Sequence, residues 1–147
     1  MITDNLTKLA DGQAFTAGTT YSTYCYDTAN VTPKRDIGNG EPMALVFSVG
    51  TAAAGSTDTT SFAATSSTSA TDGSTGAKEL ASAVIANALL TLGSVHVIVI
   101  PPSANVQRYV YGRVVLGSGD TITCDIDMVP MSFIGKYETY ADAVTWT

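Results

Sequence analysis

The sequence predicts an all-β protein of one domain. Its 147 residues match the usual size of a single domain. About eight short stretches have the composition or the alternation of β-strands, and turn residues separate them. No strand alternates with a long helical segment, so we expect a sandwich or a barrel and not a parallel α/β sheet. We divide the chain into an N-terminal segment (1–18), a β core (19–130) and an irregular C-terminal tail (131–147).

The start of the chain favours a short helix from Thr3 to Gly12. Thr3 or Asp4 can cap its first turn, Leu6 and Leu9 share one face, and Gly12 can end it. A helix this short depends on packing against the rest of the domain.

The first strands follow the N-terminal segment. Residues 21–26 are rich in tyrosine and in hydroxyl side chains, which strands favour. Asn39-Gly40 is a turn signal, since both residues tolerate a positive φ. Pro42 marks the start or the edge of the next strand. The apolar residues of 43–49 then alternate, which predicts a strand with one buried face.

Small residues dominate the middle of the chain. Ala, Gly, Ser and Thr make up most of 50–76, and Phe62 is the only large apolar residue there. We expect a long, partly mobile loop with one weak strand near 61–65, because loops of this length are usually functional or disordered. Residues 78–92 satisfy both strand and helix spacing, and we prefer a strand followed by a short turn that ends at Gly93.

Three strands are expected in the last third. An apolar run over 95–100, closed by two prolines, predicts a strand buried on both faces. Residues 108–116 form the next strand. Residues 121–129 alternate strictly, and this places Asp125 and Asp127 on a solvated or partner-facing side. The short turn at 117–120 predicts that the last two strands form a hairpin.

Charge is scarce and mostly negative. The net charge is −6, the sequence pI is about 4.4 and charged residues make up 14% of the chain. The few Lys and Arg residues offer no basic surface to a phosphate backbone or an anionic membrane, so we expect no nucleic-acid and no membrane partner. A polar surface with little charge is easily desolvated against other proteins.

The first residues lack the charged and apolar regions of a signal peptide, and no apolar run approaches the roughly 20 residues of a membrane helix. We therefore expect synthesis in the cytoplasm. Cys25 and Cys124 are expected to be two reduced, buried thiols.

No catalytic, cofactor or metal site is expected, and we predict that the protein is not an enzyme. His96, the only histidine, lies in an apolar strand with no nucleophile at a motif spacing. Asp125 and Asp127 resemble paired carboxylates, but on an alternating strand such residues are more often solvated. Residues 36–41 lack the acidic positions of an EF-hand and are interpreted as a turn. The enzyme alternative is a small hydrolase with His96 in a solvent-lined cleft.

Arg108 opens a strand between aromatic residues. Beside Tyr109 and Tyr111 it can stack on a ring and make a forked ion pair. We expect its partner to be Asp36 or Glu41, and the alternative is an unpaired surface arginine.

Several stretches together resemble a known family. Residues 1–4 followed by 11–14 are similar to the start of the capsid cement (decoration) proteins of podovirus-type tailed phages. Residues 36–42 resemble the most recognisable motif of that family, and 107–109 with the glycine loop at 117–119 resemble a third one. The resemblance covers most of residues 1–130.

The resemblance implies a jelly-roll β-sandwich on the outer surface of the virion, made in the host cytoplasm and bound to the major capsid protein of the shell. It also implies self-association, with a homodimer expected and a trimer possible, and no enzymatic activity or cofactor. The residues that we expect at protein interfaces come from the turn, the arginine strand and the tail: Asp36, Asn39, Glu41, Arg108, Tyr109, Tyr137, Tyr140 and Trp146.

A second hypothesis comes from a different class of function. Phage jelly rolls and lectins share an architecture, so the protein can also be a host- or glycan-binding module. Tyr21, Tyr24 and Tyr26 would then form a platform for a sugar.

Overall fold

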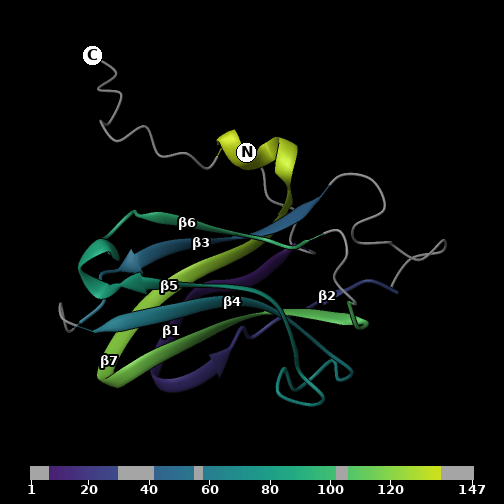
Figure 1. Ribbon diagram of the computed structural model, residues 1–147, viewed down its shortest axis with the longest axis horizontal. Helices are drawn as coiled ribbons and strands as arrows, with labels where there is room; N and C mark the ends of the chain where they lie inside the picture. Colours follow the sequence, from purple (N-terminus) through teal and green to yellow (C-terminus); the bar gives the residue numbers. More distant parts are fainter. Residues whose placement is uncertain (1–6, 30–41, 55–57, 102–105, 137–147) are drawn as a thin grey trace.

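The computed structural model describes residues 7–29, 42–54, 58–101 and 106–136. Strands dominate this part of the chain, so the all-β prediction is confirmed (Figure 1). The strands are β1 (Lys8–Tyr21), β2 (Tyr26–Asp27), β3 (Met43–Thr51), β4 (Thr59–Ser67), β5 (Lys78–Ala86), β6 (Val95–Val99) and β7 (Tyr109–Pro130), and two 3-10 helices are η1 (Asn87–Leu89) and η2 (Met131–Lys136). None of the described helices is long and apolar enough to cross a membrane.

The strands form one seven-stranded antiparallel sheet that folds over on itself. The order is β5-β4-β7-β3-β6, and β1 and β2 also pair with β7. The fold is therefore a sandwich that is nearly closed into a barrel, with β5 and β6 as the two edges of the path (Figure 1).

Strand β7 joins the two layers of the sandwich. Its 22 residues bend sharply around 117–120 (Figure 1), so that β4 pairs with the arm 109–115 and β3 with the arm 123–130. The predicted hairpin is wrong, because the described arms pair with other strands and not with each other. Strand β1 follows both arms, with a register shift between Thr16 and Gly18. Such irregularities let paired strands turn a corner together.

Strand β1 also corrects the expected helix. Residues 8–12 belong to β1, whereas 1–6 lie outside the described residues. Leu9 and Ala10 are adjacent and both fully buried, because register shifts interrupt the alternation here, and Gly12 has a positive φ of 54°. The described part of the expected helix, residues 8–12, is thus an irregular strand.

The weak strand expected near 61–65 is confirmed as part of β4, whereas the mobile loop expected around it is wrong over 59–67. It is nine residues long, and Phe62, Ala63 and Ala64 are fully buried. The small residues of this segment lie between β5 and β7, which pair with both sides of β4. The following turn is held by its own side chains, since the Ser67 hydroxyl donates to the carbonyl oxygens of Asp72 at 2.9 Å and Thr75 at 2.7 Å.

Aromatic packing connects the two layers. The ring of Phe47 on β3 stacks on Phe62 on β4, with centroids 4.6 Å apart and an interplanar angle of 21°. The first arm of β7 approaches this pair through Gly112, where an added Cβ would meet Ile126 Cδ1 at 2.9 Å.

The region 78–100 follows the predicted order of strand, turn and strand. Strand β5 passes into η1, and the chain turns at Gly93 before β6. The prediction that 95–100 is buried on both faces is wrong in one respect. Because β6 is an edge strand, His96 and Ile98 face inward while Val99 is exposed.

Candidate protein-binding surface

Arg108 makes the predicted forked ion pair, but with a different partner. Its Nε lies 2.9 Å from Asp27 Oδ1 and its Nη2 2.9 Å from Asp27 Oδ2. Its partner among the described residues is thus Asp27, and the expected partners Asp36 and Glu41 lie outside the described ranges. The pairing of β2 with β7 sets Asp27 opposite Tyr109 and so beside Arg108, an alignment that sequence spacing does not reveal.

The same ion pair fixes the entry to β7. The Arg108 guanidinium also lies 4.9 Å from the centre of the Tyr109 ring, as the stacking prediction requires. Asp27 accepts a further hydrogen bond from the N–H of Ala29 at 2.9 Å. The hydrogen bond from Arg108 is the main reason why the pKa of Asp27 is lowered, so the carboxylate stays charged. This clamp orders residues 27–29 against β7.

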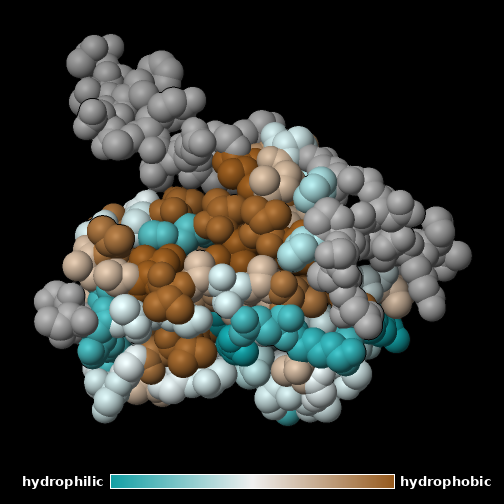
Figure 2. Space-filling view, viewed as in Figure 1, coloured by the Kyte–Doolittle hydropathy of each residue, from teal (hydrophilic) through white to brown (hydrophobic). Residues whose placement is uncertain are grey.

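A second feature is a group of exposed aliphatic side chains where β5 passes into η1 and on to β6. Val84, Leu89 and Leu92 are 69%, 65% and 74% exposed. We call these three residues the apolar corner. Figure 2 shows apolar side chains at the left of the molecule, in the place where Figure 1 draws η1. Large aliphatic side chains gathered on a surface commonly mark a contact with another protein.

A buried polar network supports the apolar corner. The Thr60 hydroxyl donates to Asn87 Oδ1 at 2.6 Å, and Asn87 Nδ2 donates to Asp120 Oδ2 at 2.8 Å. The Asn87 N–H donates to the carbonyl oxygen of Asp58 at 2.9 Å. All three members of the side-chain network are buried, so η1 is tied to both β4 and the bend of β7.

A third feature is the outer face of β6. Val95, Val97 and Val99 alternate with the inward residues and pair with Ser48, Val46 and Ala44 of β3. We call these three the valine row. Figure 2 shows apolar side chains gathered over β6, in the upper part of the described surface. This exposed row comes from the strand that the sequence predicted to be wholly buried.

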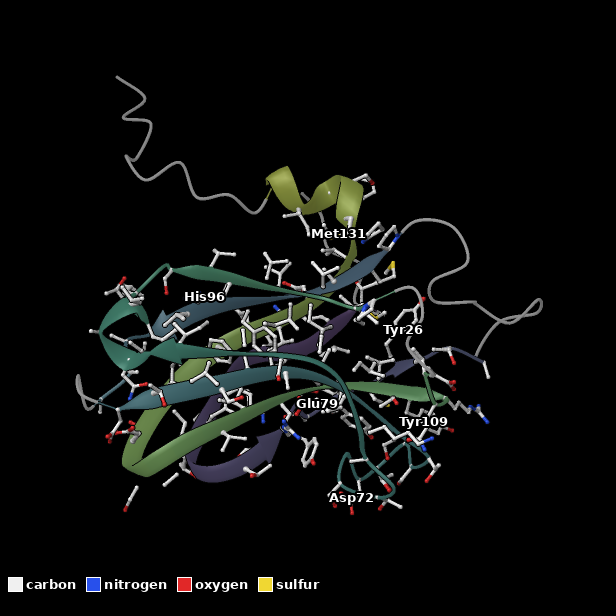
Figure 3. All side chains as sticks on the ribbon, in the orientation of Figure 1. Tyr26, Asp72, Glu79, His96, Tyr109 and Met131 are labelled. Carbon is white, nitrogen blue, oxygen red and sulfur yellow. The ribbon has the colours of Figure 1, made fainter. Side chains whose placement is uncertain are left out.

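His96, which also belongs to β6, packs against β4 and the turn before its own strand. Its ring is 5.8 Å from that of Phe62, and Nε2 is 3.3 Å from the Ser94 hydroxyl. Partial burial lowers the pKa of His96, so the imidazole is held in its neutral form. Figure 3 shows His96 at the opposite end of the molecule from Tyr26 and Tyr109.

The two aspartates of β7 differ in their surroundings. Asp125 is half-buried and accepts a hydrogen bond from the N–H of Gly12 at 2.6 Å. Asp127 is only 7% exposed, and its Oδ1 has no hydrogen-bond partner among the described residues. Burial raises the pKa of Asp127, although the charge of Lys8 acts in the opposite direction. The expectation that Asp127 is solvated is therefore wrong. Within the described ranges, no three His, Cys, Asp or Glu side chains gather to hold a metal ion.

Both cysteines are free thiols, as predicted. Cys124 is fully buried, and burial raises its pKa to about 12. Cys25 is only half-buried, which corrects the expectation that both are buried, and its Sγ lies 3.6 Å from the carbonyl oxygen of Ala70.

The three tyrosines do not form a common platform. Tyr26 belongs to the core, and Tyr21 packs edge-on against Tyr111, with centroids 6.4 Å apart. Tyr24 alone of the three is strongly exposed. The sugar-platform interpretation is therefore wrong for Tyr26 because its side chain is directed into the core.

Other predicted interface residues lie outside the part of the chain that the structure describes: Asp36, Asn39, Glu41, Tyr137, Tyr140 and Trp146. Only Arg108 and Tyr109 of the predicted set are described. The apolar corner was missed from the sequence, although the ambiguous apolar spacing of 78–92 was its one visible signal.

Comparison with protein-family models identifies a family that covers most of the chain. The model of the family described as Bbp16 matches residues 9–129. No curated protein matches the chain.

Proposed function

This chain belongs to the Bbp16 family, whose model matches most of its length, and from this premise we propose that it is a structural protein of a phage particle. In this proposal it is a capsid cement protein that binds the outer surface of the head and connects neighbouring major capsid subunits. The resemblance of residues 36–42 and 107–109 to capsid cement proteins supports this function.

The apolar corner is the observation that carries the proposal. Full burial of an exposed Val or Leu side chain contributes roughly 1.5–3 kcal/mol to the free energy of binding. Val84, Leu89 and Leu92 project from a corner that the Asn87 network holds in place, so little conformational entropy is lost when a partner covers them. We assign the apolar corner to contact with the shell.

Three of the cations on the described surface form ion pairs within the chain. Lys8 pairs with Asp11 at 2.7 Å, Arg108 with Asp27, and Arg113 with Glu79. A surface on which most cations are paired attracts polyanions only weakly. It is better suited to a partner that binds through complementary shape and buried apolar area. This pattern supports a protein partner, the major capsid protein, over a nucleic acid or a membrane.

The mechanism that we propose is a combination of weak contacts. A contact through the corner alone is small compared with a standard interface of about 800 Å² per partner. Additional contacts, through the turn at 36–41, the tail or a second copy of the chain, would benefit from the high effective concentration that the first contact creates. Such a protein would hold adjacent shell subunits together against internal pressure.

The proposal is tested by sedimentation of the purified chain with capsid shells that were assembled without it. We expect the wild-type chain to pellet with the shells. Leu92→Asp should bind about tenfold more weakly or worse, since a leucine that the shell would cover is replaced by a charge. Thr71→Asp is the matched control, because it adds the same charge to the exposed turn between β4 and β5 and should bind as wild type. Failure of the wild-type chain to pellet would contradict the proposed function, and equal binding of Leu92→Asp would contradict the role of the corner.

A further inference from the structure

The outer edge of β6 presents unpaired backbone groups whose identity follows from its pairing with β3. The N–H of Ile100 donates to the carbonyl oxygen of Met43, and the N–H of Val49 donates to that of Ser94, both at 2.9 Å. Hydrogen-bonded pairs alternate with non-bonded pairs along antiparallel strands. The valine row lies at the alternate positions, so its N–H and C=O groups are directed away from β3. Among the described strands, β6 pairs with β3 alone.

The valine row is also apolar on its side-chain face. His96 and Ile98 face the core opposite Phe47 and Leu45, so the valines lie on the outer face of the sheet. Val99 is exposed, and Val95 and Val97 are partly exposed. An added strand with apolar residues at alternate positions would both satisfy the backbone groups and cover this face.

Helix η2, which leads to residues 137–147, begins close to one end of this edge. Helix η2 begins with the N–H of Met131 bonded to the carbonyl oxygen of Pro42 at 2.9 Å. Pro42 precedes Met43, which pairs with Ile100 at the Val99 end of β6. Figure 1 shows η2 above β3 and β6. Because η2 spans only six residues, the chain that leaves it lies within about 12 Å of this end, and a strand that runs from the Val99 end toward Val95 would be antiparallel to β6.

The residues after η2 have the length and composition of such a strand. Residues 137–147 span roughly 35 Å when extended, and five-residue β6 spans about 17 Å. They contain no Gly or Pro and are rich in Tyr, Thr, Val and Trp, which strands favour. Tyr140, Val144 and Trp146 are separated by even numbers of residues, so in a strand they share one face.

We propose that residues 137–147 add to the free edge of β6 in the same chain as an antiparallel strand, with Tyr140, Val144 and Trp146 over the valine row. The occupant is the chain's own tail because a short covalent connection gives it an effective concentration in the millimolar range, which a second copy does not reach in dilute solution. The inference is independent of the shell contact assigned to the apolar corner.

Amide hydrogen exchange, followed by NMR, tests the pairing residue by residue. The full chain is compared with a chain that ends at Lys136. We expect the amides of Val97 and Val99 to exchange at least about tenfold faster in the shortened chain, since the tail no longer accepts their hydrogen bonds. The Ile98 amide, which is directed toward β3, should be equally protected in both and so shows that the shortened chain is folded. Equal exchange of Val97 and Val99 in the two folded chains would overturn the proposal.

Fluorescence gives a second readout, because Trp146 is the only tryptophan. We expect its emission to be blue-shifted relative to that of the chain in denaturant, independently of protein concentration. Val97→Lys should shift the emission to the red by charging the covered face, whereas Thr71→Lys should leave it unchanged. Emission typical of exposed indole in the native full chain would overturn the proposal. A blue shift that disappears on dilution would also overturn it, by assigning the tail to a second copy.

Discussion

Phe62 on β4 stacks on Phe47 on β3, and this contact joins the two layers that the bent strand β7 creates. Both rings are fully buried. The layers share β7 and β1 but are otherwise held together by side-chain packing. A substitution that removes side-chain volume from this stack should therefore lower the free energy of unfolding strongly.

We expect Phe62→Ala to lower the free energy of unfolding by about 3–5 kcal/mol, since it removes apolar burial and leaves a cavity beside Phe47. Urea unfolding followed by circular dichroism measures this change. Val84→Ala removes an exposed side chain from the neighbouring strand and should change stability by less than about 0.5 kcal/mol. A loss of less than 1 kcal/mol for Phe62→Ala would show that β4 is not a core strand.

The Thr60–Asn87–Asp120 network predicts a difference between two conservative changes. Thr60→Val removes the hydroxyl that donates to Asn87 Oδ1 and leaves a buried acceptor unpaired, which costs about 1–3 kcal/mol. Thr60→Ser keeps the hydroxyl and should cost clearly less. Thermal and urea unfolding of both variants check the order, and Thr60→Val at least as stable as Thr60→Ser would contradict the network.

Asp127 predicts a pH dependence of stability. Its folded pKa is raised above its ordinary value of 3.8 because it is buried, so the folded state binds its proton more tightly than the unfolded state. This contribution is fully present below pH 3.8 and is lost as the pH rises through the folded pKa. Lys8 opposes the effect, and Asp125 and Asp11 reinforce it.

We therefore expect Asp127→Asn, which cannot ionise, to gain stability relative to wild type as the pH rises from 3.8 toward neutrality. Urea unfolding at a series of pH values measures the difference. Asp11→Asn, on the exposed side of Lys8, is the comparison: its folded pKa is lowered, chiefly by the hydrogen bond from Lys8, so its stability difference from wild type should change mainly below pH 3.8 and in the opposite direction. A difference between Asp127→Asn and wild type that does not vary with pH would contradict the assignment.

The sequence predicted the strands whose apolar residues alternate without interruption. Residues 43–49 and 121–129 have this pattern, and both lie in long regular pairings of β3 and β7. Strand β1 was mistaken for a helix because register shifts break its alternation. Strand β4 was predicted only as a weak strand near 61–65 within a loop, because Ala, Ser and Thr carry little apolar signal, and its burial comes from β5 and β7 on its two sides.

The contacts of the candidate surface could be predicted only where they form between residues that are close in the sequence. The fork and the ring contact of Arg108 follow from its chemistry and from adjacent Tyr109, and both are present. Its partner Asp27 depends on how β2 aligns with β7, which is a long-range property. The exposure of Leu89 and Leu92 likewise depends on where η1 lies relative to the sheet. The sequence alone does not show which apolar side chains the fold leaves exposed to solvent.

The two thiols should react very differently in the native protein. Cys25 is half-buried, whereas Cys124 is enclosed by the core and its pKa is raised to about 12, so hardly any thiolate forms there at pH 8. We expect a thiol reagent such as Ellman's to modify one cysteine in the native chain and two in denaturant. Cys25→Ser should abolish the native reaction and keep the single reaction in denaturant. Rapid native modification of the Cys25→Ser variant would show that the core around Ile122 and Ile126 opens far more readily than its packing implies.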